Sequence, residues 1–180
     1  MEISRPPFDG VVEFQPRIFH DERGWFLETF KKSLFAEILP GIEFKQGNQS
    51  FSRKGALRGL HLQKQPYQQG KLVRVISGKV LDVIVDIRQD SATYGKWYST
   101  ILDAERQNMM YVPEGFAHGF YTLEDAVFSY MCTNEYNKES EEGIIWNDPD
   151  LNIDWQLDGE PNVSEKDLIL PKLSELGKLF

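Results

Sequence analysis

The chain has 180 residues, of which 41% are hydrophobic and 13% aromatic, so it is long enough to bury one core and too short to suggest two. We therefore expect one domain over residues 1–180. Its net charge of −8 argues against binding to nucleic acid, and its one cysteine, Cys132, rules out an internal disulfide and suits a reducing compartment such as the cytoplasm.

The N-terminal segment has neither a basic region nor an apolar run, and no later segment approaches the roughly 20 apolar residues of a membrane span, so we expect neither export nor membrane insertion. Short runs rich in β-branched and aromatic residues, closed by Gly, Pro, Asn or Asp, predict an all-β chain. The expected strands are residues 11–19, 25–29, 44–51, 56–62, 71–77, 79–88, 97–102, 108–112, 117–123 and 127–133.

The clearest hairpin joins residues 71–77 to 79–88, because Gly78 supplies the positive φ of a tight turn. Apolar positions in residues 31–39 follow one helical face and predict a short helix. Near the C-terminus, Ser164 predicts a capped turn, and residues 172–179 predict a second, weak helix. So many short strands favour a jelly-roll barrel or sandwich with a few short peripheral helices, since closed forms hide their edges.

Three polar clusters interrupt the strand pattern. In Arg58-Gly59-Leu60-His61-Leu62-Gln63, strand alternation places His61 and Gln63 on one face. Lys71 opens the next strand and faces the same interior if the two strands are neighbours. In Pro113-Glu114-Gly115-Phe116-Ala117-His118-Gly119-Phe120, two glycines flank His118 at a strand start, where backbone can approach a ligand closely.

A histidine in a strand is more often a hydrogen-bonded structural group than a catalyst. Arg58 and Lys71 beside His61 favour catalysis, because burying two cations is costly unless an anion or developing negative charge arrives. His118 either orients a ligand or satisfies a backbone carbonyl, and His20 is expected to be solvated.

A required metal is not expected. With Gln63 two residues after His61, only His61 and His118 remain as ligands, fewer than the three or four donors of a catalytic zinc or iron site.

These clusters, in this order, resemble the dTDP-4-dehydrorhamnose 3,5-epimerase family, metal-free cupin-fold enzymes of the dTDP-L-rhamnose route. The resemblance covers nearly the whole chain. It continues through Asp21-Glu22-Arg23-Gly24-Trp25-Phe26-Leu27-Glu28, Gln46-Gly47-Asn48-Gln49-Ser50, Gly70-Lys71-Leu72-Val73-Arg74 and Trp146-Asn147-Asp148-Pro149. It implies a cupin-type jelly roll and, without a cofactor, epimerisation of dTDP-4-dehydro-6-deoxy-D-glucose at C3 and C5 for polysaccharide biosynthesis.

The resemblance also implies residue roles: His61 as base, Asp167 as its carboxylate partner, Tyr130 as general acid and Lys71 at the C4 oxygen. It implies a homodimer with an exchanged N-terminal strand that reaches the partner's nucleotide. Glu135 departs from the family, which often has an aromatic residue there. The implied substrate-binding residues are Arg23, Phe26, Glu28, Gln46, Asn48, Arg58, His118, Tyr136 and Lys166.

Other interpretations keep these residues. An epimerase acting only at C3 or only at C5 would need the same groups. From different classes, a metal-dependent cupin oxygenase and a non-catalytic nucleotide-sugar-binding module are the alternatives. Taken alone, Tyr130 also fits a core aromatic and Asp167 a cap at a short helix.

Overall fold

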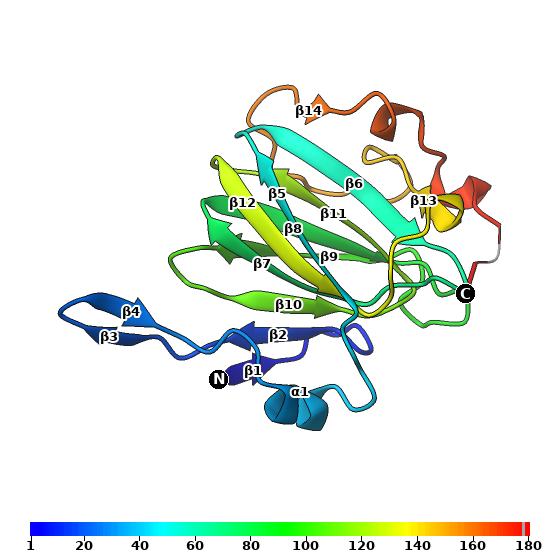
Figure 1. Cartoon of the computed structure of the whole chain (residues 1–180). Coiled ribbons are helices and arrows are strands. Elements are labelled where there is room, and N and C mark those ends of the chain that lie inside the picture. The colour runs from blue at the N-terminus through cyan, green and yellow to red at the C-terminus, as the bar shows by residue number, and fades with distance from the viewer. Residues whose placement is uncertain (178) are drawn as a thin grey trace.

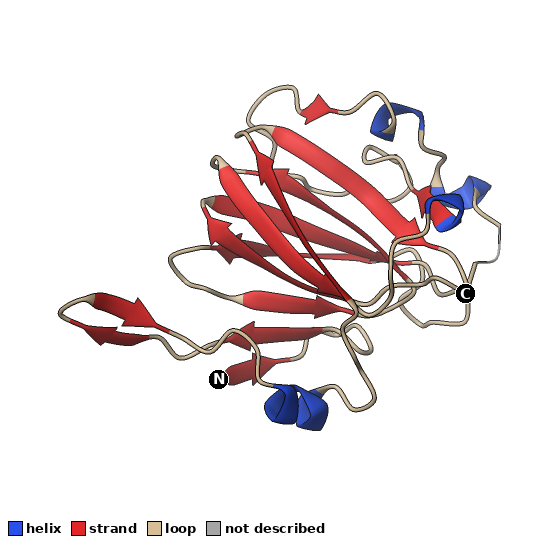
Figure 2. Ribbon diagram, viewed as in Figure 1, coloured by secondary structure: helices blue, strands red, loops and turns tan. Residues whose placement is uncertain are grey.

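The computed structural model describes residues 1–177 and 179–180 and consists of two facing layers of strands (Figures 1 and 2). Within the layers all neighbouring strands are antiparallel except β14 and β6, which pair in parallel. In spatial order the first sheet contains β1 (Glu2–Ser4), β2 (Val12–Gln15), β10 (Met109–Val112), β7 (Lys71–Ser77), β12 (Ala126–Cys132) and β5 (Gln46–Ser52). The second contains β13 (Glu141–Gly143), β6 (Ala56–Gln63), β11 (Phe116–Thr122), β8 (Lys79–Asp86) and β9 (Trp97–Asp103), with β14 (Asn162–Val163) beside β6.

Smaller elements lie outside the two layers. A two-stranded hairpin, β3 (Phe19–Asp21) and β4 (Gly24–Phe26), projects from the body of the molecule (Figure 1). The helix α1 (Lys32–Ile38) packs beside β1 and β2. Three 3₁₀ turns follow in the second half of the chain: Lys138–Ser140, Asp167–Ile169 and Leu173–Glu175.

This architecture confirms the predicted all-β, cupin-type jelly-roll class. The predicted hairpin of residues 71–77 and 79–88 is wrong. Both strands form, but β7 pairs with β10 and β12 in the first sheet and β8 pairs with β9 and β11 in the second. Gly78, with a φ of 74°, is the one residue between them, too short a loop for a two-residue hairpin turn, and it leads the chain from one sheet to the other. The short helix predicted over residues 31–39 also forms. The one-domain expectation for residues 1–180 stays a prediction.

Several predicted boundaries are wrong. The strand expected over residues 11–19 ends at Gln15, because Pro16 follows and has no N–H for a ladder. The strand expected over residues 25–29 stops at Phe26, since the chain leaves the hairpin there. In place of a helix over residues 172–179 there is one 3₁₀ turn, and residue 178 of that range lies outside the described residues.

The space between the sheets is apolar at its centre, where the rings of Phe120 and Phe128 stack with centroids 4.3 Å apart. Outside the first sheet, Phe35 of α1 packs on Phe14 with ring centroids 5.0 Å apart. Outside the second sheet, the C-terminal segment covers the strands with Trp155 and Leu173. Both sheets are therefore backed by other parts of the chain, so the strands that line the interior are held from behind.

None of the helices in the described part of the chain has the length and hydropathy that a membrane-spanning helix needs.

Candidate active site

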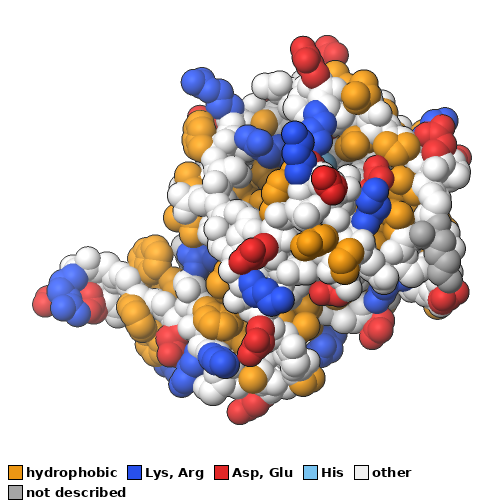
Figure 3. Space-filling model, turned by 45° about the vertical axis from the view of Figure 1, so that its right-hand side comes forward, with side chains coloured by type: hydrophobic (Ala, Val, Ile, Leu, Met, Phe, Trp, Pro, Cys, Tyr) orange, Lys and Arg blue, Asp and Glu red, His pale blue; other side chains and the backbone are white. Residues whose placement is uncertain are grey.

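A cavity of about 460 Å³ opens between the two sheets, and its lining combines charged and polar side chains with the central rings of Phe120 and Phe128. A second hollow of about 320 Å³ adjoins it, and both are lined by His61, Lys71 and Tyr130. Figure 3 shows the hollowed face, with part of a histidine at its floor and basic and acidic side chains around its rim. These three side chains therefore stand where two compartments meet.

His61 and His118 come from neighbouring strands and are direct cross-strand partners in the pairing of β6 with β11. Two glycines allow this close approach. A Cβ on Gly59, whose φ is +130°, would lie 2.6 Å from the Cα of Gly119, and a Cβ on Gly119 would lie 2.6 Å from the carbonyl oxygen of Arg58. Any larger residue at either position would push the two strands apart.

The imidazole of His61 is held by a buried carboxylate, since its Nε2 lies 2.7 Å from Asp167 Oδ1. Asp167 begins a 3₁₀ turn, and its carboxylate also accepts a hydrogen bond from the N–H of Gly59 at 3.2 Å. Ser164 accepts from the N–H of Asp167 at 3.2 Å, as its predicted capping role requires. Burial opposes ionisation of Asp167, but these contacts outweigh it and lower the pKa of the carboxyl group. The carboxylate thus fixes the orientation of the ring.

Lys71 and Tyr130 reach the cavity from the opposite wall, on the neighbouring strands β7 and β12. Burial lowers the pKa of Lys71, and the neighbouring acidic groups of Cys132, Asp82 and Glu141 oppose that shift. Burial raises the pKa of Tyr130, so its phenol keeps its proton at neutral pH. A base, a cation and a weak acid therefore face one another across the interior.

His118 is held by a carboxylate that carries no local sequence signal. Its Nε2 lies 3.0 and 2.9 Å from the two oxygens of Asp82, which is fully buried in β8. The sequence left open whether His118 satisfies a backbone carbonyl or orients a ligand. The structure instead pairs it with a side chain 36 positions away and places it in the cavity lining.

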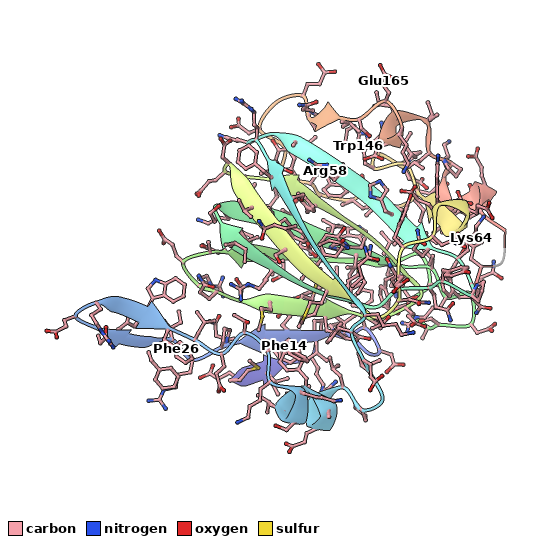
Figure 4. All side chains as sticks on the ribbon, viewed as in Figure 1. Phe14, Phe26, Arg58, Lys64, Trp146 and Glu165 are labelled. Carbon is pink, nitrogen blue, oxygen red and sulfur yellow. The ribbon has the colours of Figure 1, made fainter. Side chains whose placement is uncertain are left out.

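Arg58 lies at the cavity edge on β6 (Figure 4). Its Nε donates to Ser52 Oγ at 2.9 Å and its Nη2 donates to the carbonyl of Phe51 at 3.2 Å. These bonds fix the plane of the guanidinium, the group best shaped to bind phosphate oxygens in pairs.

The second hollow gathers predicted residues from distant parts of the chain. The Gln46 amide donates to Asn48 Oδ1 at 2.9 Å and accepts from the N–H of Tyr136 at 2.8 Å. Glu141, which the sequence motifs did not single out, accepts from Tyr136 Oη at 2.8 Å and forms an ion pair with Lys166. Glu141 was missed because β13 has only three residues, too few to show alternation.

Three predicted residues lie away from the cavity. Arg23 sits in the hairpin turn and bonds to Asp21, with an Nη2–Oδ2 distance of 2.5 Å, and its side chain is 85% exposed. Phe26 is 64% exposed on the projecting hairpin, far from Arg58 in Figure 4. Glu28 follows the hairpin and is exposed, and none of the three lines either hollow.

Glu135 is exposed beside Tyr136. Across the described residues, no group of three or more His, Cys, Asp or Glu side chains is arranged to hold a metal ion. The two cavity histidines each direct Nε2 to a carboxylate. The groups present suit proton transfer to and from a carbon atom that lies beside an oxygen able to take negative charge.

Comparison with known proteins gives one consistent result. The family model described as dTDP-4-dehydrorhamnose 3,5-epimerase matches residues 5–175. An enzyme of that name from Shigella flexneri is 47% identical over 93% of this chain and 93% of its own length. The crystal structure of dTDP-6-deoxy-D-glucose-3,5-epimerase from Legionella pneumophila, in complex with dTDP-4-keto-L-rhamnose, is 44% identical, with a TM-score of 0.94 over 98% of this chain and 94% of that one.

A 3′-monoepimerase from Streptomyces bikiniensis, in complex with dTDP-quinovose, is 35% identical, with a TM-score of 0.89 over 94% of this chain and 86% of that one.

Proposed function

The chain belongs to the dTDP-4-dehydrorhamnose 3,5-epimerase family and is an isomerase, and on that premise we propose that it inverts dTDP-4-dehydro-6-deoxy-D-glucose at C3 and C5 to give dTDP-4-dehydro-L-rhamnose. The observation that carries the proposal is the placement of His61 and Tyr130 on opposite walls, with Lys71 beside the space between them. A base and an acid on opposite faces are what inversion needs, because a base that returned its own proton would restore the starting configuration.

In the proposed mechanism, His61 removes the proton at C5, and then at C3, while Asp167 holds the ring and stabilises the imidazolium that forms. Lys71 stabilises the negative charge that develops on the C4 oxygen. Preorganised charge of this kind is typically worth about 3 to 4 kcal/mol per donor. Tyr130 then delivers a proton to the opposite face of the ring, which its raised pKa leaves it able to do.

Substrate binding is proposed to use the two compartments differently. Arg58 at the cavity edge suits the diphosphate, and His118 and Lys166 line the same cavity. In the second hollow, Gln46, Asn48 and Tyr136 form a hydrogen-bonded cluster of amide and aromatic groups. The complexes of the Legionella and Streptomyces proteins with dTDP-linked sugars support a substrate of this class.

We further propose a homodimer in which the hairpin reaches the partner's site. Phe19, Trp25 and Phe26 are 47%, 57% and 64% exposed on a two-stranded element that projects from the body (Figure 1). Apolar surface gathered on such an element is typical of an interface. Arg23, Phe26 and Glu28 would then meet a nucleotide in the other copy, which is why they lie outside the cavity of their own chain.

A single-centre epimerase is the second candidate, favoured by the likeness to the Streptomyces 3′-monoepimerase. Incubation with dTDP-4-keto-6-deoxyglucose in D₂O, followed by NMR, separates the two. Deuterium at both C3 and C5 supports double inversion, deuterium at one carbon supports a single-centre enzyme, and none at either carbon rejects both for this substrate. The Tyr130→Phe variant should still wash deuterium into the substrate through His61, but should lose the inverted product.

A further inference from the structure

The cavity contains two histidine–carboxylate pairs side by side, of which the proposed mechanism uses one for proton removal. His61 and His118 are cross-strand partners, and each directs Nε2 to an aspartate. The pairs differ in exposure. The side chains of His61 and Asp167 are 31% and 5% exposed, whereas those of His118 and Asp82 are 7% and 0% exposed.

Burying the second pair, His118 and Asp82, costs free energy unless the carboxyl group of Asp82 has a role in the site. Asp82 stands among apolar residues in the middle of β8, with no solvent exposure. Its two oxygens face His118 Nε2 at 3.0 and 2.9 Å. Burial raises the pKa of Asp82, and the positive charges of His118 and Lys71 oppose that rise. Asp82 is therefore held by the histidine that it contacts, and its carboxyl group also interacts with Lys71.

The geometry has a consequence for His118. His118 Nε2 is within hydrogen-bonding distance of both oxygens of Asp82, and one N–H can donate to both, so Nε2 is the nitrogen that carries the proton pointing to Asp82. The other nitrogen, Nδ1, has no hydrogen bond among the described residues, and the residue lines the cavity. Asp82 therefore orients the imidazole so that its Nδ1 edge is the one available to a ligand in the cavity.

Asp82 also acts on Lys71 across the interior. Burial favours the neutral amine of Lys71, and two carboxylates of the facing sheet oppose it, Asp82 in β8 and Glu141 in β13. The titratable and charged groups that surround Lys71 and Asp82 are His61, His118, Asp167, Glu141, Cys132, Tyr130, Arg58 and Lys166.

We propose that Asp82 is a positioning residue for the epimerase reaction: it orients His118 through Nε2, so that the Nδ1 edge of the ring faces the cavity, and it supports the ammonium form of Lys71. This inference rests on the proposed function. Asp82 itself touches no substrate. Its effect is to prepare charge before the enolate forms, when rearranging it would slow the reaction.

The test is Asp82→Asn, which keeps the shape and removes the charge. We expect kcat to fall about tenfold or more, with KM changed little, because supporting partners of this kind typically contribute 10- to 100-fold. Without the negative charge, Lys71 loses its proton more readily, so the alkaline limb of the pH–rate profile should move to lower pH. A merely structural role would lower the melting temperature and leave the limb in place.

Asp148→Asn is the matched control. Asp148 is 1% exposed and accepts hydrogen bonds from the N–H groups of Asp150 and Leu173, but it lines neither hollow. This variant should lower the melting temperature without moving the alkaline limb. An unshifted limb in Asp82→Asn, or an equal shift in both variants, would overturn the proposal.

A substrate-free measurement separates this proposal from the proposed function. The chain has three histidines, so ¹⁵N NMR of the free protein resolves each ring. In the wild type, His118 should show a proton on Nε2 that exchanges slowly with solvent, and Asp82→Asn should lose that protection. The wild-type spectrum tests the geometry even if the variant fails to fold, and a rapidly exchanging or Nδ1-only proton on His118 would contradict it. Failure of the wild type to exchange sugar hydrogens in D₂O would remove the proposed function while leaving this spectrum unchanged.

Discussion

The side chains of the cavity have partners within the same chain, whereas those of the β3–β4 hairpin are largely exposed. In the cavity, His61, His118 and Lys166 each meet a carboxylate of the same chain. On the hairpin, Trp25 and Phe26 are left largely in water, and Arg23 bonds only to a neighbour two residues away. The contrast agrees with the proposed homodimer, in which one chain holds the proposed proton-transfer groups and the hairpin surface contacts a second copy. The predictions below test that division.

The largest effect is expected from His61→Ala. Removing a general base should lower kcat by roughly 10²- to 10⁴-fold, because no other described group on that wall occupies its place. Product formation followed by NMR gives the rate, and the melting temperature checks that the variant folds. Lys54→Ala, which removes an exposed cation paired with Asp158, is the control and should stay within about twofold of wild type. Turnover that survives in His61→Ala would break the assignment of the base.

Arg23→Ala should raise KM about tenfold and leave kcat nearly unchanged, since a hydrogen bond to a charged phosphate contributes about 1.5 to 3 kcal/mol. Mixing this variant with His61→Ala tests where Arg23 acts. In an exchanged dimer, a mixed pair contains one site with both residues intact, and random exchange puts about a quarter of all sites in that state. Activity with a wild-type KM should therefore appear on mixing. No such gain, with subunit exchange verified by mass, would mean that the hairpin acts on its own chain or not at all.

The pH–rate profile tests which group of the cavity limits activity on the alkaline side. Burial lowers the pKa of Lys71, so its ammonium form is lost at a lower pH than that of an ordinary lysine, and activity should fall on the alkaline side. The raised pKa of Tyr130 puts its own deprotonation at higher pH, so the limb belongs to Lys71. Lys71→Arg keeps a positive charge that does not titrate in this range, and should move the limb to higher pH at a reduced maximal rate.

The smallest expected effect is the change in the free energy of unfolding caused by the hairpin variant Phe26→Ser. Most of this ring is already in water, so the free energy of unfolding of the monomer should change by no more than about 0.5 kcal/mol, while the dimer dissociates at higher protein concentration. Phe128→Ala, at the apolar centre between the sheets, should instead cost about 3 to 5 kcal/mol. Denaturation curves and light scattering on both variants give the comparison. A large loss of monomer stability in Phe26→Ser would show that the ring packs within its own chain.

The local sequence pattern predicted those strands that are long enough to show a repeating pattern and are bounded by turn residues. The strand Lys71–Ser77 is of this kind. The hairpin expected after it was wrong, because local sequence does not show that the next strand joins the other sheet. Glu141–Gly143 and Asn162–Val163 were missed, because two or three residues show no period and form strands only through pairing with β6. The strand expected over residues 11–19 was too long because Pro16, which has no N–H for a ladder, ends it at Gln15.

Some residues of the candidate site could be predicted from the sequence and others could not. His61, Lys71 and Arg58 stand out because polar residues interrupt apolar strands, and the cavity brings them together with Tyr130 and Asp167. Asp82 has no such signal, since one carboxylate in a β-branched strand gives no hint of a histidine 36 positions later. The roles of these residues stay predictions, because position in a cavity fixes what a group can touch and the kinetic tests decide what it does.

The contact between Gly59 and Gly119 limits how this enzyme type can diversify. Because backbone meets backbone there, the spacing between the two imidazoles is not adjustable by repacking side chains, and a single added methyl group would displace both rings together. If the second hollow binds substrate as proposed, we expect new sugar specificities to arise mainly at its wall around Gln46 and Tyr136, where side chains line the space. A library of variants aimed at altered substrates should leave the glycine pair untouched and vary that wall.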